Sequence, residues 1–157
     1  MRRNGTRPSA KIRPSYLQNI MQDLDVETRD RIDAMFFEAR ALLDHGEKSQ
    51  ALLLAAQAWD SLLEPRFDWD VSQSYVHMLA KLRRDAGDFE GALEIMRALF
   101  ESGTVEPYQD RPHFVLDTVY YEMGDLDQAR LHFVEANRIS RGRCFQGEPA
   151  KHKQLIQ

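Results

Sequence analysis

The stretch Gly87-Asp88-Phe89-Glu90-Gly91-Ala92 decides the fold of this chain, because its pattern occurs three times. The other copies are Gly46-Glu47-Lys48-Ser49-Gln50-Ala51 and Gly124-Asp125-Leu126-Asp127-Gln128-Ala129. Each copy places glycine where a helix ends, an acidic residue where the next helix begins, and alanine where two helices touch. The glycines are 41 and then 37 residues apart, enough for one helical hairpin and its connecting loop. The pattern therefore predicts a helical repeat protein.

Apolar residues at helical spacing flank each copy and predict three helical hairpins, over about 26–64, 70–102 and 111–139. Asp25 and Thr28 are start signals for the first hairpin, Pro65 ends it, and Asp70 is predicted to cap the first helix of the second. Residues 140–149 are predicted to be an irregular linker. Short helices are expected around Tyr16–Met21 and in a C-terminal cap over 148–157, where Leu155 and Ile156 pack inward. Since no segment alternates like a strand, the predicted fold class is all-α.

Composition and charge are those of a soluble globular protein, with 157 residues, 43% hydrophobic and 29% charged. Residues 1–14 are predicted to be a basic flexible arm and residues 15–157 a single helical domain. The arm carries five basic residues and no acid, so the rest of the chain has a net charge of −9. The arm is interpreted as solvated, with contact to nucleic acid or an acidic partner as the alternative. An acidic body argues against nucleic acid as the partner of the folded part.

Localisation is predicted from what the sequence lacks. No apolar run approaches the length of about 20 residues that spans a bilayer, so no membrane partner is expected. The N-terminal sequence has no apolar stretch typical of a secretory signal, and the single cysteine, Cys144, cannot form an internal disulfide. These features predict a reducing, cytoplasmic location.

The three hairpins resemble tetratricopeptide repeats in their second helices. In that family an alanine opens the second helix and apolar residues follow four and seven positions later, as in Ala92, Met96 and Leu99. A small residue twelve positions before the alanine appears as Ala39 and Ala80, but as Asp117 in the third hairpin. The resemblance covers about residues 30–140 and implies hairpins stacked as a superhelix, although the units exceed the usual repeat of about 34 residues.

The resemblance also implies a binding groove, because the first helices of such repeats line a concave face. By register, Phe36 and Tyr120 are expected in the core, and Met78 belongs to the apolar stripe of its helix. The residues expected to face a partner are Asp33, Phe37, Arg40, Ser74, His77, Lys81, Arg84, Arg111, Phe114, Thr118 and Tyr121. The groove is thus expected to be basic and aromatic.

The closing stretch Ser140–His152 is similar to the tail of small bacterial repeat proteins that act as immunity proteins beside secreted polymorphic toxins. It departs from them at Pro149 and His152, where an acid and an aromatic residue are expected. The first functional hypothesis is therefore a cytoplasmic immunity protein that binds and neutralises a cognate toxin. The alternative is a secretion chaperone or adaptor that binds a peptide segment in its concave groove. The oligomeric state is left open.

Catalytic and metal-binding patterns were not found in the sequence. The five histidines form no metal-ligand spacing with each other or with Cys144, and no glycine pattern cradles a phosphate. Arg143 beside Cys144 would lower the pKa of its thiol, but no positioned base is identifiable, so an incidental thiol is favoured. No enzyme activity, metal or cofactor is expected.

Overall fold

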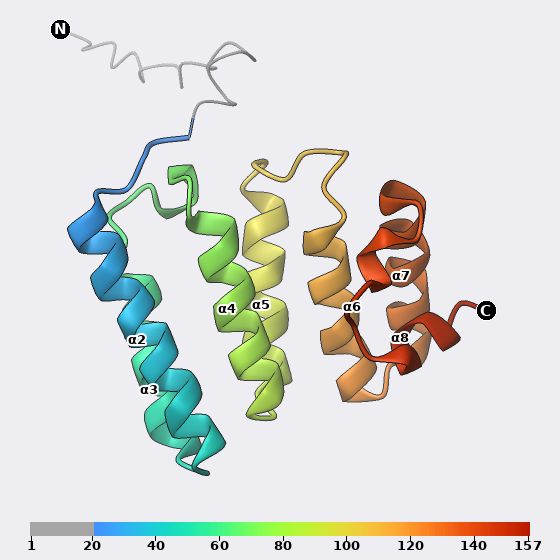
Figure 1. Ribbon diagram of the computed structural model, residues 1–157, viewed down its shortest axis with the longest axis horizontal. Coiled ribbons are helices and arrows are strands. Elements are labelled where there is room, and N and C mark those ends of the chain that lie inside the picture. Colours follow the sequence, from blue (N-terminus) through green and yellow to red (C-terminus); the bar gives the residue numbers. More distant parts are fainter. Residues whose placement is uncertain (1–20) are drawn as a thin grey trace, which may run out of the picture.

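The computed structural model describes residues 21–157, which are all-α as predicted (Figure 1). The only β contact within this range is an isolated bridge between Gln22 and Trp69. The predicted arm over 1–14 and most of the short helix expected at Tyr16–Met21 lie outside the described residues. The helices are α2 (Val26–Asp44), α3 (Lys48–Asp60), η1 (Arg66–Asp68), α4 (Ser72–Asp85), α5 (Phe89–Glu101), α6 (Arg111–Met123), α7 (Leu126–Ser140), η2 (Arg143–Phe145) and α8 (Ala150–Gln154).

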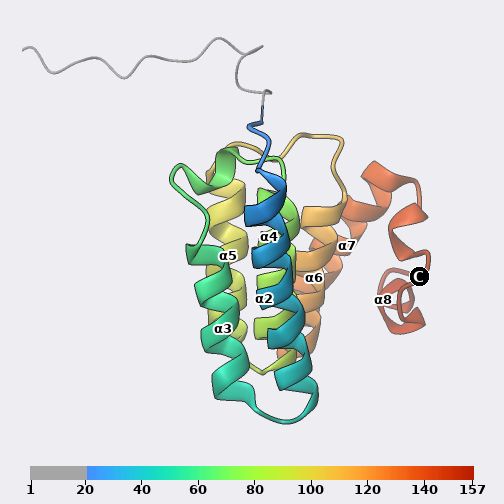
Figure 2. The ribbon, with the colours of Figure 1, turned by 60° about the vertical axis from the view of Figure 1, so that its left-hand side comes forward.

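Three helical hairpins follow one another along the molecule, as the sequence predicts. They pair α2 with α3, α4 with α5, and α6 with α7 (Figure 1). The first helices also pack in a row, with α4 between α2 and α6. Figure 2 shows α3 and α5 together on one side of α2 and α4. We call the side of this row that presents Phe37, Met78 and Lys81 the first-helix face.

The repeated glycines act as helix terminators. Gly46, Gly87 and Gly124 have φ values of +83°, +81° and +85°, in the left-handed region that a residue with a Cβ rarely adopts. The acids that follow two of them cap the next helix: the Asp88 carboxylate accepts a hydrogen bond from Gly91 N at 3.0 Å, and that of Asp125 accepts one from Gln128 N at 3.2 Å. Each hairpin is therefore closed by its own local sequence.

Replacing Gly87 by alanine is expected to lower the free energy of unfolding by about 1 to 2 kcal/mol. A Cβ at Gly87 would meet no atom within 4 Å, so the cost comes from the left-handed backbone alone. Urea unfolding followed by circular dichroism measures it. Glu94→Ala, at an exposed position on α5, is the control and should change stability by less than about 0.5 kcal/mol. Equal stability of the two variants would contradict the role assigned to the glycine.

The alanines of the repeated pattern lie where two helices contact each other. Ala51, Ala92 and Ala129 are completely buried, and so are Met96 and Leu99 of the second hairpin. Short side chains at these positions let neighbouring helices approach closely while larger residues interdigitate around them. The alanine pattern therefore identifies core positions correctly.

Asp70 does not cap α4, contrary to the prediction. The helix begins at Ser72 after Val71, and no side chain caps it. The Asp70 carboxylate instead accepts a hydrogen bond from Leu24 N at 3.1 Å and pairs with Arg29 at 2.6 Å. The Asp70 carboxylate therefore binds partners from a segment distant in sequence and leaves the start of α4 uncapped.

Residues 141–149 are mostly irregular, as predicted, but they include the 3₁₀ helix η2 (Arg143–Phe145) and bury two of its side chains, so this stretch packs against the hairpin. Cys144 and Phe145 join Phe114 and Phe133 in a second apolar cluster on the third hairpin. Leu155 and Ile156, which follow α8, pack against this cluster as predicted. We call residues 141–157 the C-terminal segment, drawn in red in Figure 1.

Candidate protein-binding groove

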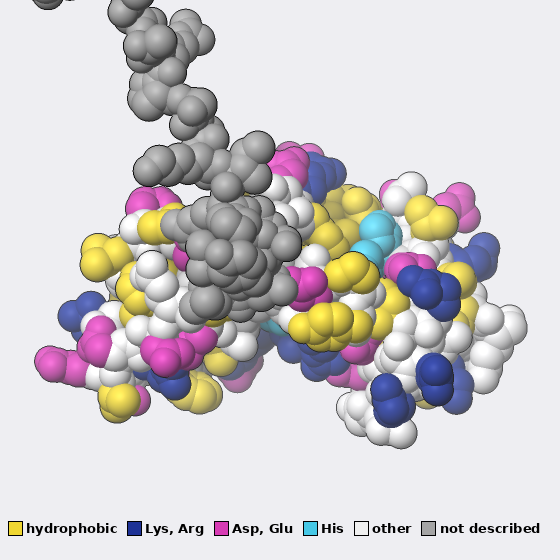
Figure 3. Space-filling model, turned by 90° about the horizontal axis from the view of Figure 1, so that it is seen from above, with side chains coloured by type: hydrophobic (Ala, Val, Ile, Leu, Met, Phe, Trp, Pro, Cys, Tyr) yellow, Lys and Arg dark blue, Asp and Glu magenta, His cyan; other side chains and the backbone are white. Residues whose placement is uncertain are grey.

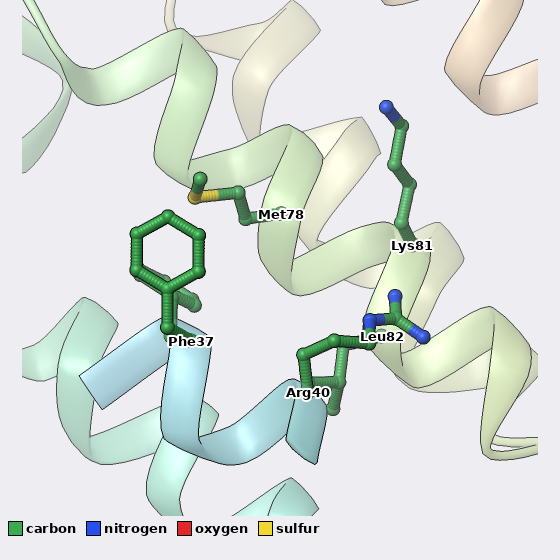
Figure 4. A pocket seen from close by; sticks show the side chains of 6 residues that line it. Phe37, Arg40, Met78, Lys81 and Leu82 are labelled. Atoms are coloured by element: carbon green, nitrogen blue, oxygen red, sulfur yellow. The ribbon is translucent and has the colours of Figure 1, made fainter. Parts of the chain in front are cut away.

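A pocket of about 200 Å³ opens between α2 and α4 on the first-helix face (Figure 4). Its apolar part is formed by Phe36 and Phe37 from α2 and by Met78 and Leu82 from α4, and Arg40 and Lys81 add positive charge. Phe37 is 69% exposed and Met78 is 37% exposed. Large apolar side chains are therefore presented to solvent at the edge of a concave site, where a ligand could cover them.

The structure brings together the predicted binding residues of the first two hairpins. Ser74, His77, Lys81 and Arg84 recur along α4 at spacings of three and four residues. Of these, Lys81 lines the pocket together with Phe37 and Arg40 of α2 (Figure 4). Asp33 is half-buried and accepts a hydrogen bond from the Tyr75 hydroxyl at 2.7 Å, so its carboxylate is engaged within the protein.

Phe114 and Thr118 are not presented to a partner, which corrects the prediction. Phe114 is only 2% exposed, because the rings of Phe145 and His152 from the C-terminal segment lie 5.8 and 5.9 Å from it. The Thr118 hydroxyl is buried, donates to Val115 O at 2.7 Å and accepts from Arg84 at 2.7 Å.

The C-terminal segment also engages the remaining predicted residues of the third hairpin. Tyr121 is half-buried beneath it, with the His152 ring at 5.2 Å and the Lys151 ammonium at 5.0 Å from the Tyr121 ring. Arg111 is exposed but pairs with Glu148 at 3.0 Å. The residues that line the pocket therefore come from α2 and α4.

Most charged side chains of the groove are paired. Asp85 bonds Arg40 of α2 at 2.9 Å and Arg84 at 2.8 Å, so one carboxylate serves two guanidinium groups. Lys81 lies near these cations and Arg111, and burial together with the charge of Arg111 lowers the pKa of its ammonium. Burial, reinforced by the charges of Lys81 and Arg111, lowers the pKa of His77 to about 4, so this imidazole is neutral at pH 7.

Basic side chains also gather elsewhere on the molecule. Figure 3 shows several Lys and Arg side chains over the end formed by α7 and the C-terminal segment. Arg138 at this end pairs with Glu135 of its own helix, and Lys151 pairs with Glu122. These exposed pairs are ordinary surface contacts.

Sequence reasoning missed Met78 and Asp85 as groove residues. Met78 was assigned to the apolar stripe of its helix, but it lies four residues after Ser74 and three before Lys81, on the same side. Asp85 lies four residues after Lys81, so the same spacing would have found it. Met78 was missed because it is apolar, and Asp85 was missed because the predicted face of α4 ended at Arg84.

Metal ligands, the single thiol and the helix lengths of residues 21–157 bear on other kinds of site. This range contains no group of three or more side chains that could hold a metal ion. Burial raises the pKa of the Cys144 thiol, so the lowering expected from Arg143 is wrong and the thiol is not activated. None of the helices in the described range is both long and apolar enough to cross a bilayer.

The chain matches no model of a known protein family, and no curated protein sequence matches it.

Proposed function

We propose that this protein is a non-enzymatic interaction module that binds a segment of another protein in the groove between α2 and α4. The observation that supports the proposal is the exposure of Phe37 and Met78 beside Lys81 and Arg40 in one pocket. Exposed aromatic and methionine side chains at a concave site are frequent anchors of protein interfaces, because they bury much apolar area on binding.

Within this class, the first candidate is a cytoplasmic immunity protein that neutralises a cognate bacterial toxin. It is supported by the similarity of the tail and by the net charge of −9 outside the basic arm, which would favour association with a basic toxin surface. The alternative, a secretion chaperone or adaptor, is supported by the size of the pocket. About 200 Å³ is enough for one large side chain of an extended segment.

Replacing both Phe37 and Met78 by serine is expected to weaken partner binding by at least about tenfold, because two apolar anchors are lost. The partner is first isolated from the native host on the immobilised wild-type protein and identified by mass spectrometry. Binding of the purified partner is then measured by calorimetry. The matched control replaces Leu131 and Val134, two exposed apolar residues of α7, by serine.

The results of this experiment separate the two candidates. An immunity protein should suppress the activity of the isolated partner in a stoichiometric complex. A chaperone or adaptor should leave that activity unchanged and bind a synthetic peptide from the partner as well as the whole partner. If the α7 control loses binding and the groove variant keeps it, the groove proposal is wrong.

A further inference from the structure

Within residues 21–157, Lys81 is the one cation of the groove that forms no ion pair. Arg40 and Arg84 share Asp85, and Arg111 pairs with Glu148 at 3.0 Å. The Lys81 ammonium has no ion pair or hydrogen bond to any described residue. Four cations thus face two carboxylates on this part of the first-helix face. The excess of positive charge would attract an anion from a partner, and Lys81 is the cation that is free to pair with it.

His77 adds an unpartnered polar atom beside Lys81. It lies one helical turn before Lys81 and is only 9% exposed, and its Nε2 atom is buried without a hydrogen-bond partner. A buried polar atom without a partner is costly, so a ligand whose binding moved the covering side chains and brought an acceptor to Nε2 would recover that free energy. A neutral imidazole protonated at Nε2 would donate to such an acceptor.

The first-helix face already holds one carboxylate of this kind, supplied by the chain itself. Glu148 lies close enough to Lys81 for its charge to oppose the lowering of the Lys81 pKa that burial and Arg111 cause, but its carboxylate bonds Arg111. A carboxylate is therefore compatible with this cluster of cations, and a carboxylate from a ligand could pair with Lys81.

A peptide carboxylate fits this surface better than a polyanion does. The chain outside its basic arm carries a net charge of −9, which would repel a nucleic acid with its continuous row of phosphates. A single acidic side chain would meet only the local positive charge. Lys81 also lines the same pocket as Phe37 and Met78, so the acid and an apolar side chain must be close neighbours in the ligand.

We propose that Lys81, together with His77 and flanked by Arg40 and Arg111, forms a carboxylate-binding subsite. The ligand is an acidic peptide segment that places an Asp or Glu side chain on Lys81 and an adjacent apolar side chain between Phe37 and Met78. This inference depends on the proposed function, because it specifies the chemistry of the segment that the groove binds.

The test selects peptides from a random phage-displayed library on the immobilised full-length protein. Only peptides whose binding is lost with the Phe37→Ser, Met78→Ser double variant are retained. We expect these groove-dependent peptides to be enriched in Asp or Glu next to Phe, Leu or Met. The best peptide is then synthesised with its acids intact and with each acid replaced by its amide, and affinity is measured by fluorescence anisotropy.

We expect the wild-type protein to bind the acidic peptide at least about tenfold more tightly than the amide form. The Lys81→Met variant should bind the two peptides with equal affinity. Lys81→Arg should restore part of the preference. Lys48→Met, which removes an exposed lysine from α3, is the control and should keep the full preference. Circular dichroism melts verify that each variant is folded.

The outcomes distinguish the two proposals. Groove-dependent peptides without acids, or a preference for acids that survives Lys81→Met, would overturn the carboxylate subsite and leave the proposed function standing. A library that yields no peptide dependent on Phe37 and Met78 would overturn the proposed function and the subsite with it.

Discussion

Replacing Asp117 by alanine is expected to raise the free energy of unfolding by about 2 to 4 kcal/mol at pH 7. Asp117 of α6 is completely buried, and neither of its carboxylate oxygens has a hydrogen-bond partner. Burial raises its pKa to about 10, so the folded protein keeps this carboxyl protonated while the unfolded chain ionises it. Folding at pH 7 must therefore take up a proton at a free-energy cost. Alanine removes this cost and matches Ala39 and Ala80, the buried residues at the equivalent positions.

The pH dependence gives the Asp117 prediction a second measurement. A carboxyl whose pKa is higher in the folded state favours folding most below the pKa of the unfolded chain, about 3.8, and this stability is lost as the pH rises toward about 10. The stability gained by Asp117→Ala should therefore grow from pH 5 to pH 9, by up to about 1.4 kcal/mol per pH unit.

Urea unfolding at several pH values, followed by circular dichroism, checks both parts of the Asp117 prediction. Glu38→Ala, at an exposed position on α2, is the control and should show no comparable gain. A variant less stable than the wild type, or a gain that does not change with pH, would mean that the Asp117 carboxyl has a partner in the folded protein.

The hairpins could be predicted from sequence because their signals are local. A glycine with positive φ, a capping acid within three residues of the end of the helix, and an alanine in the contact all act over a short stretch of the chain. The partners of Asp70 could not be predicted in this way. Leu24 and Arg29 lie more than forty residues away in sequence, and nothing in the loop indicates that the chain before α2 returns to it.

The groove could be predicted only in part, for a related reason. Helical register gives the side of a helix on which a residue lies, but it does not show whether another segment covers that side. Phe37 is open, whereas Phe114, placed by the same reasoning, is covered by Phe145 and His152. The apolar and aromatic residues of 141–157 were a signal that this segment packs somewhere, but they did not indicate where.

Replacing Ala92 by glutamate is expected to lower the free energy of unfolding by about 3 to 5 kcal/mol and to reduce the melting temperature by ten degrees or more. Ala92 is completely buried in the first turn of α5, at the close contact that the repeated sequence specifies. Glutamate there would bring an unpaired charge and several extra atoms into a packed core. Circular dichroism melts at pH 7 measure the effect, with Leu53→Glu at an exposed position of α3 as the control.

The Ala92→Glu variant should also be partly rescued by acid, which separates the cost of the charge from the cost of the extra volume. A buried glutamate has a raised pKa in the folded state, so its destabilisation is smallest near pH 4 and grows as the pH rises. Comparing the variant with the wild type at pH 4 and pH 7 gives the two costs. A melting midpoint at pH 7 equal to that of the wild type would contradict the packing of α5 in its hairpin. If the variant lost the same stability at pH 4 and at pH 7, the ionisation of the glutamate would contribute nothing, and the extra volume of the side chain would account for the whole effect.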